Sequence, residues 1–147
     1  MTKDVIVSIA GLQYEVSEDE AVEIISRGEY YYRNNKHYVR YEELAEDSGN
    51  PLKITNCTLK ISNDRIDLMK KGVSNVHMTF ERDKSNMTYY NTPFGDLLLG
   101  IHTKTIDIKE ADALIEITLT YGLDINNEHV SDCTLNIKIQ ATQKKTT

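Results

Sequence analysis

Residues 113–125 read ALIEITLTYGLDI, and an apolar or aromatic side chain occupies every second position of that stretch. Polar residues or glycine stand between them, with Leu114 as the one apolar exception. Successive side chains of a β-strand point to opposite faces, so this alternation predicts a long strand with a core face and a solvent face. Four further runs repeat the pattern, and they start at Val5, Cys57, Val76 and Cys133.

Short clusters of Asn, Asp, Ser and Gly separate these runs, as at residues 33–36, 62–64 and 126–127. Such residues supply a positive φ or local hydrogen bonds where a chain turns. The spacing of the clusters predicts sequential hairpins. We therefore expect an all-β fold, a single antiparallel up-and-down barrel of about eight to ten strands with little helix.

The apolar positions change parity within one predicted strand. Leu97, Leu99 and Ile101 are odd-numbered, whereas Ile106 and Ile108 are even-numbered. One strand keeps both sets on one face only if it carries an extra residue. The sequence therefore predicts a β-bulge or bend between Gly100 and Thr105.

One segment supports two local structures. Residues 17–20 form a capping-box pattern and Gly28 is a good C-cap, which favours a helix between them. The alternation of Val22 and Ile24 with Glu23 favours a strand that leads into the three tyrosines at 30–32.

Composition agrees with a β domain. Val, Ile, Thr, Tyr and Phe provide 48 of the 147 residues, and these residue types fit a pleated, half-buried surface. A chain of this length buries enough surface to hold a core without disulfides or metals. We predict one domain, 1–147, with an ordered core of about 4–141 and a polar tail at 143–147.

The net charge of −6 is concentrated in residues 15–47, which contain ten acidic and four basic side chains. A dedicated nucleic-acid binder normally shows a basic stripe, so no nucleic-acid partner is expected. The acidic flank is either a solvated surface or a docking surface for a basic partner.

The first residues lack the apolar region of a signal peptide, and no long apolar run predicts a membrane span. We therefore expect a cytoplasmic protein. Cys57 and Cys133 share the parity of apolar neighbours. They are expected to be free, buried and unreactive thiols.

Several segments, in this order along the chain, resemble the YwiB-like family of small bacterial proteins, which has no assigned function. They are Tyr30–Tyr32, Asn34-Asn35, His37–Glu43, Thr58–Ile61, Met78–Glu81, Tyr90–Gly95 and Leu119–Tyr121. The resemblance implies a calycin-like, lipocalin-like barrel. It also implies that residues 20–32 form a strand, and it brings no catalytic or ligand residues with it.

No motif predicts catalysis, a cofactor or a metal. The four histidines, 37, 77, 102 and 129, form no metal-binding spacing and are expected at the surface. The chain has no Gly-rich phosphate loop and no GxSxG nucleophile motif. We therefore expect a protein that is not an enzyme.

The many tyrosines of the predicted strands are compatible with two functions. In the first, the barrel lumen holds a small, partly apolar or amphipathic ligand. Its expected lining is Val39, Tyr41, Phe80 and Tyr121, with Arg40, Glu42 or Glu43 orienting the ligand according to which face of strand 37–43 points inward. In the second, a packed barrel docks a protein partner, or a second copy of itself, through the acidic flank or an edge strand.

Overall fold

The computed structural model describes residues 3–11, 23–45, 53–72, 75–92 and 95–142, and these ranges form ten β-strands and no helix. None of them therefore provides a helix that could cross a membrane. The strands are β1 (Asp4–Ala10), β2 (Glu23–Arg33), β3 (Lys36–Ala45), β4 (Lys53–Ile61), β5 (Arg65–Lys71), β6 (Val76–Glu81), β7 (Ser85–Thr92), β8 (Gly95–Ala111), β9 (Leu114–Ile125) and β10 (Glu128–Ala141).

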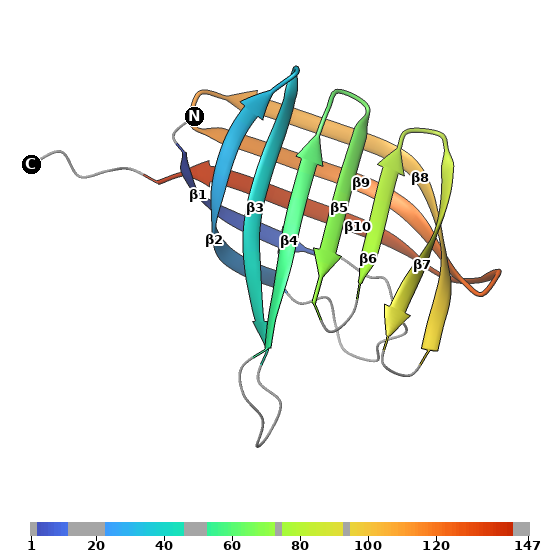
Figure 1. Ribbon diagram of the computed structural model, residues 1–147. Helices are drawn as coiled ribbons and strands as arrows, with labels where there is room; N and C mark the ends of the chain where they lie inside the picture. Colours follow the sequence, from blue (N-terminus) through green and yellow to red (C-terminus); the bar gives the residue numbers. More distant parts are fainter. Residues whose placement is uncertain (1–2, 12–22, 46–52, 73–74, 93–94, 143–147) are drawn as a thin grey trace, which may run out of the picture.

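The strands form one antiparallel sheet that curls into a nearly closed barrel. Strands β2 to β6 lie in front in Figure 1, and β1, β10, β9 and β8 cross behind them at a steep angle. The first and last strands pair with each other, with Val5 opposite Ala141. The predicted all-β, up-and-down barrel of eight to ten strands is confirmed.

The meander is interrupted at one place, between β6 and β7. These strands follow each other in the chain, yet they stand at the two ends of the sheet order. Within residues 75–92 a single bridge joins them, in which Asn75 and Asn91 exchange backbone hydrogen bonds of 3.1 and 2.9 Å. We call this interrupted junction the seam.

The turn that precedes β7 is anchored to β8. The Asp83 amide donates to the Thr103 carbonyl at 3.0 Å, and the Thr103 amide donates to the Lys84 carbonyl at 3.1 Å. The Arg82 guanidinium also donates to the Ile106 carbonyl. The β8–β9 register shifts between Thr103 and Thr105, so the bulge predicted between Gly100 and Thr105 is confirmed.

The barrel interior is filled by every second side chain of the strands. In β9 the buried residues include Ile115, Ile117, Leu119 and Tyr121, which confirms the alternation that the sequence predicts. Within this core the ring of Tyr121 packs edge-on against Phe80, with centroids 5.0 Å apart. Such an arrangement is favourable for aromatic pairs.

Strand β2 occupies the segment for which the sequence left two structures open. Residues 23–33 are a strand, so the helix is wrong there and the strand implied by the family resemblance is confirmed. Residues 17–22, which hold the capping-box pattern, lie outside the described residues. β2 forms ladders with both β1 and β3, and these long-range hydrogen bonds outweigh the local helix signal.

Gly28 of β2 sits where neighbouring strands approach closely. A Cβ atom there would lie 2.9 Å from the Arg40 carbonyl oxygen and 3.1 Å from Val7 Cγ2. At Gly122 of β9 the nearest atom would be 3.6 Å away, which is ordinary contact.

Gly28→Ala should therefore lower the free energy of unfolding by about 1–3 kcal/mol through overpacking. Gly122→Ala should change it by less than about 1 kcal/mol, because added contact and reduced chain freedom oppose any strain. Urea denaturation of the two variants measures the difference. Equal effects would contradict the close approach at Gly28.

Candidate functional site

The four predicted lumen residues all point into the barrel. Val39 and Phe80 are fully buried, while Tyr41 is 4% and Tyr121 1% exposed. This settles the face of β3 that the sequence left open, because Val39 and Tyr41 lie inside while Arg40 is exposed outside. These side chains belong to one packed core cluster. Their role in holding a ligand stays a prediction.

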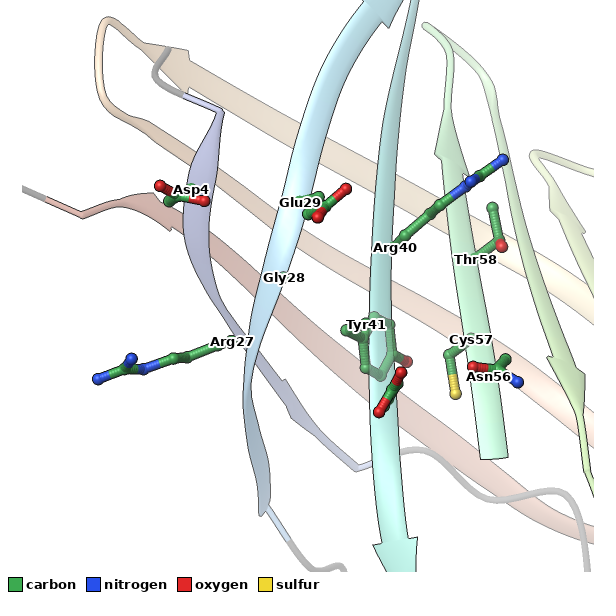
Figure 2. Close-up of a pocket in the computed structure, with 10 residues that line it drawn as sticks. Asp4, Arg27, Gly28, Glu29, Arg40, Tyr41, Asn56, Cys57 and Thr58 are labelled. Carbon is green, nitrogen blue, oxygen red and sulfur yellow. The ribbon is translucent and has the colours of Figure 1, made fainter. Parts of the chain in front are cut away.

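Arg40 and Glu42 are exposed on the outer face of β3. They help to line a hollow of about 730 Å³, and Figure 2 is a close-up of this hollow. Its other lining residues come from β1, β2, β3 and β4. The full lining is Asp4, Arg27, Gly28, Glu29, Arg40, Tyr41, Glu42, Asn56, Cys57 and Thr58. Figure 2 shows Arg27 and Arg40 extending in opposite directions, so their charges do not converge on one point.

The acidic flank is described only in part. Glu23, Glu29 and Glu42 are exposed on β2 and β3, whereas residues 15–20 and 46–47 lie outside the described ranges. Glu23 accepts a hydrogen bond from the Ser8 hydroxyl at 2.6 Å. The idea of a docking surface for a basic partner stays a prediction.

Glu43, the third predicted orienting residue, lies on the inward parity of β3 and forms an ion pair inside the barrel. Its Oε1 is 2.7 Å from Nζ of Lys70, and the Lys70 side chain is only 5% exposed. Cys57 stands opposite Lys70 across the β4–β5 ladder, and Tyr41 stands opposite Cys57. We call these four residues (Tyr41, Glu43, Cys57 and Lys70) the inner polar cluster.

Burial in this cluster determines the pKa of the Cys57 thiol. Loss of solvent, reinforced by the Glu43 carboxylate, raises the Cys57 pKa to about 12. A thiol with such a pKa stays protonated and is a poor nucleophile. Cys57 and Cys133 are both free and buried, which confirms these two parts of the sequence-based prediction.

Lys70 of the inner polar cluster is also among the residues that line a hollow at the seam. A hollow of about 360 Å³ opens there between β5, β6 and β7. It is lined by Met69, Lys70, Lys71, Asn75, Val76, His77, Thr88, Tyr89 and Asn91. We call it the seam hollow. It combines apolar side chains with one lysine that is almost fully withdrawn from solvent.

Lys70 is the residue that the sequence-based prediction missed. It shares the parity of Ile66 and Leu68, which are buried in β5. A lysine on the apolar parity of a strand was therefore the available signal. Its partner Glu43 lies 27 positions away, so only the strand register shows the pair.

Of the four histidines, all of them described, His77 lines the seam hollow. It pairs with Asp67 at 3.0 Å on the outer face. His37 contacts Glu110 at 2.8 Å, and His102 and His129 both contact Asp124. Among the residues that the structure describes, no group of three or more His, Cys, Asp or Glu side chains is arranged to hold a metal ion.

The raised pKa of Cys57 predicts a pH effect on stability. Below about pH 9 the thiol is neutral in both states, and between that value and about pH 12 only the unfolded chain ionises. Stability contributed by the neutral thiol is therefore lost as the pH rises. Urea midpoints at about pH 8 and about pH 10.5 should fall further for the wild type than for Cys57→Ala. Parallel falls would contradict the burial of an ionisable thiol.

Comparison with known proteins agrees with the fold. The uncharacterized beta-barrel protein YwiB of Bacillus subtilis (strain 168) is 29% identical over 118 residues, which cover 79% of this chain and 80% of that protein. The crystal structure of the ywiB protein from Bacillus subtilis matches with a TM-score of 0.76 at 22% identity, covering 96% of this chain and 93% of that chain.

These findings confirm the resemblance to the YwiB-like family, and they supply no function, since the relative is itself uncharacterised. A family pattern, "Domain of unknown function (DUF1934)", matches residues 7–137. The match spans most of the 147 residues, so the chain belongs to the DUF1934 family.

Proposed function

We propose that this protein is a binding barrel for a small amphipathic anion, such as a carboxylate with a short apolar chain, and that the seam hollow is its site. One observation carries this proposal. Lys70 is 4% exposed overall, faces inward, and forms part of the wall of the seam hollow. Lysine is almost never fully buried in proteins unless it is paired.

The Lys70–Glu43 pair is poorly explained by stability. Removing two charges from water costs several kcal/mol per ion, and apolar residues of similar volume often stabilise a protein equally well or better. A buried cation is useful, however, for a ligand that carries a negative charge. The pair is therefore better explained by binding than by folding.

The two partners differ in exposure. The Lys70 side chain is 5% exposed and that of Glu43 is 21% exposed. Glu43 can therefore turn towards water at low cost, while Lys70 stays inside. An incoming carboxylate would take the place of Glu43 and keep the ammonium group of Lys70 paired.

The size and lining of the hollow suit such a ligand. Small-molecule sites usually measure about 300–1,000 Å³ and combine apolar walls with a few polar groups. The seam hollow, at about 360 Å³, lies at the lower end of that range. Met69, Val76 and Tyr89 offer apolar contacts, and the lining also contains two lysines, Lys70 and Lys71.

The seam also provides a route by which a ligand can enter the seam hollow. Elsewhere in the sheet, ladders of several residue pairs join neighbouring strands, whereas among the residues that the structure describes a single bridge, Asn75 to Asn91, joins β6 and β7. Local opening at a place with few hydrogen bonds costs less than opening within a ladder. We also propose that binding takes place in the cytoplasm, because the free cysteines suit a reducing compartment.

A second candidate function is a protein-interaction module. The facing edges of β6 and β7 could accept a strand from a protein partner or from a second copy. Met87 is 52% and Tyr89 63% exposed on β7, which favours contact with an apolar partner surface. In native mass spectrometry this function predicts a multiple of 16.8 kDa instead of a ligand adduct.

Native mass spectrometry with decanoate tests the proposal. The wild type should bind one decanoate, and 1-decanol should bind at least about 10-fold more weakly, because a hydrogen bond to a charged group contributes about 1.5–3 kcal/mol. Lys70→Met should lose the preference for decanoate. Lys138→Met, which removes an exposed lysine from β10, should bind like the wild type.

Lys70→Met alone leaves Glu43 without its partner and could unfold the chain. The double variant Glu43→Leu/Lys70→Met restores an apolar pair and should be at least as stable as the wild type. If the folded double variant binds decanoate as tightly as the wild type, or if the wild type binds none, the proposal is wrong.

A further inference from the structure

Three side chains on the outer face of β7, β8 and β9 form a continuous hydrogen-bonded chain. Ser85 Oγ lies 2.6 Å from Nδ1 of His102, and Nε2 of the same imidazole lies 2.7 Å from Oδ2 of Asp124. The hydroxyl, imidazole and carboxylate therefore occur in the order that activates a serine nucleophile. We call this chain the Ser85 relay.

The carboxylate determines where the imidazole proton lies. Hydrogen bonding from His102 lowers the pKa of Asp124, so this side chain is ionised and acts only as an acceptor. In its neutral form the imidazole then carries its proton on Nε2, which donates to Asp124. Nδ1 is left with a lone pair and accepts the hydrogen of the Ser85 hydroxyl. His102 is thus placed as a base for Ser85.

The Ser85 relay lies beside a glycine of β8, which has no side chain. Gly100 of β8 stands opposite Asp124 in the ladder. A Cβ atom on Gly100 would lie 3.2 Å from Asp124 Cβ and 3.4 Å from His102 Nε2. The nearest atom would be Met87 Sδ at 3.1 Å, so a side chain at this position would require its neighbours to shift by a few tenths of an ångström.

A second imidazole holds the carboxylate from the other side. His129 Nδ1 of β10 lies 3.4 Å from Oδ1 of Asp124, and its Nε2 lies 3.6 Å from Asp132. Lys104 approaches Asp132 at 3.5 Å. Asp124 is therefore fixed by groups from two neighbouring strands, which limits its rotation and keeps Oδ2 on His102.

We propose that Ser85 is a nucleophile that accepts acyl groups from small activated esters, with His102 as its general base and Asp124 as a positioning residue. The site lies at the start of β7, and the Asn91 bridge beside the seam hollow lies at the other end of that strand. It is thus separate from the Lys70 site. It departs from the expectation, based on missing sequence motifs, that the protein is not an enzyme.

The reaction is a balanced acyl transfer. Ser85 Oγ attacks the ester carbonyl while its proton moves to His102 Nδ1. The bond between the carbonyl carbon and the leaving oxygen breaks, and the leaving alkoxide takes that proton. Water then attacks the acyl-serine, gives its proton to Nδ1, and releases the carboxylic acid as the proton returns to Oγ. Asp124 stays ionised and keeps the Nε2 proton in place throughout.

The exposure of Ser85 and His102 determines which substrates can reach the relay. Ser85 is exposed, and the His102 side chain is 38% exposed. Small esters therefore reach the hydroxyl directly.

Diisopropyl fluorophosphate is a suitable probe, because the same attack by Ser85 forms an oxygen–phosphorus bond and expels fluoride. Intact mass and peptide mapping should show one adduct, located on Ser85. Ser85→Ala should give none, and His102→Gln should react about 100-fold more slowly, the usual contribution of a general base. Asp124→Asn should also be slow, with partial recovery in Asp124→Glu.

Ser8 is a matched control within the same protein. It is also a serine on the outer surface with a short hydrogen bond, at 2.6 Å, but its acceptor is the carboxylate of Glu23 instead of an imidazole. It should stay unlabelled, and Ser8→Ala should react like the wild type. If the wild type gives no adduct at Ser85, or if His102→Gln reacts at the wild-type rate, Ser85 is not an activated nucleophile.

Discussion

Hydrogen bonding between antiparallel strands determines how this protein is built, because the register of each ladder decides which side chains share a face. Pairing of β1 with β10 joins the two ends of the chain in the middle of the sheet. The sheet edges are therefore left in the middle of the chain, at β6 and β7. The turn before β7 bonds to Thr103 of β8, and at the seam one backbone bridge joins β6 and β7 within the described residues 75–92.

Both proposed sites follow from this register. Pairing of β3 with β4 and of β4 with β5 brings Glu43 and Lys70 together inside the barrel, and Lys70 is also among the residues that line the seam hollow. Pairing of β7, β8 and β9 brings Ser85, His102 and Asp124 together on the outer face. The first site has a buried charge and the second an ordered proton path, so they suit different chemistry, binding and acyl transfer.

The sequence predicts the local features of the fold. A period of two identifies the buried face of residues 113–125, and the change of parity after Ile101 identifies the bulge, because both patterns are carried by neighbours in the chain. The sites depend on contacts between distant positions. Glu43 and Lys70 are 27 positions apart, and His102 lies 17 and 22 positions from its two partners. No local pattern contains such a register. The helix expected up to Gly28 is wrong over residues 23–28 for the same reason, since ladders on both sides of β2 override the local signal.

Amide hydrogen exchange along β7 tests the seam most directly. The Asn91 amide bonds to Asn75 across the seam, and the Lys84 carbonyl bonds to β8, so odd-numbered amides of β7 face the seam and even-numbered ones face β8. Exchange should be fast at Met87 and Tyr89 and slow at Thr88 and Tyr90. Uniformly slow exchange at all four amides would mean that β6 and β7 form a continuous ladder, and it would contradict a barrel that opens at the seam.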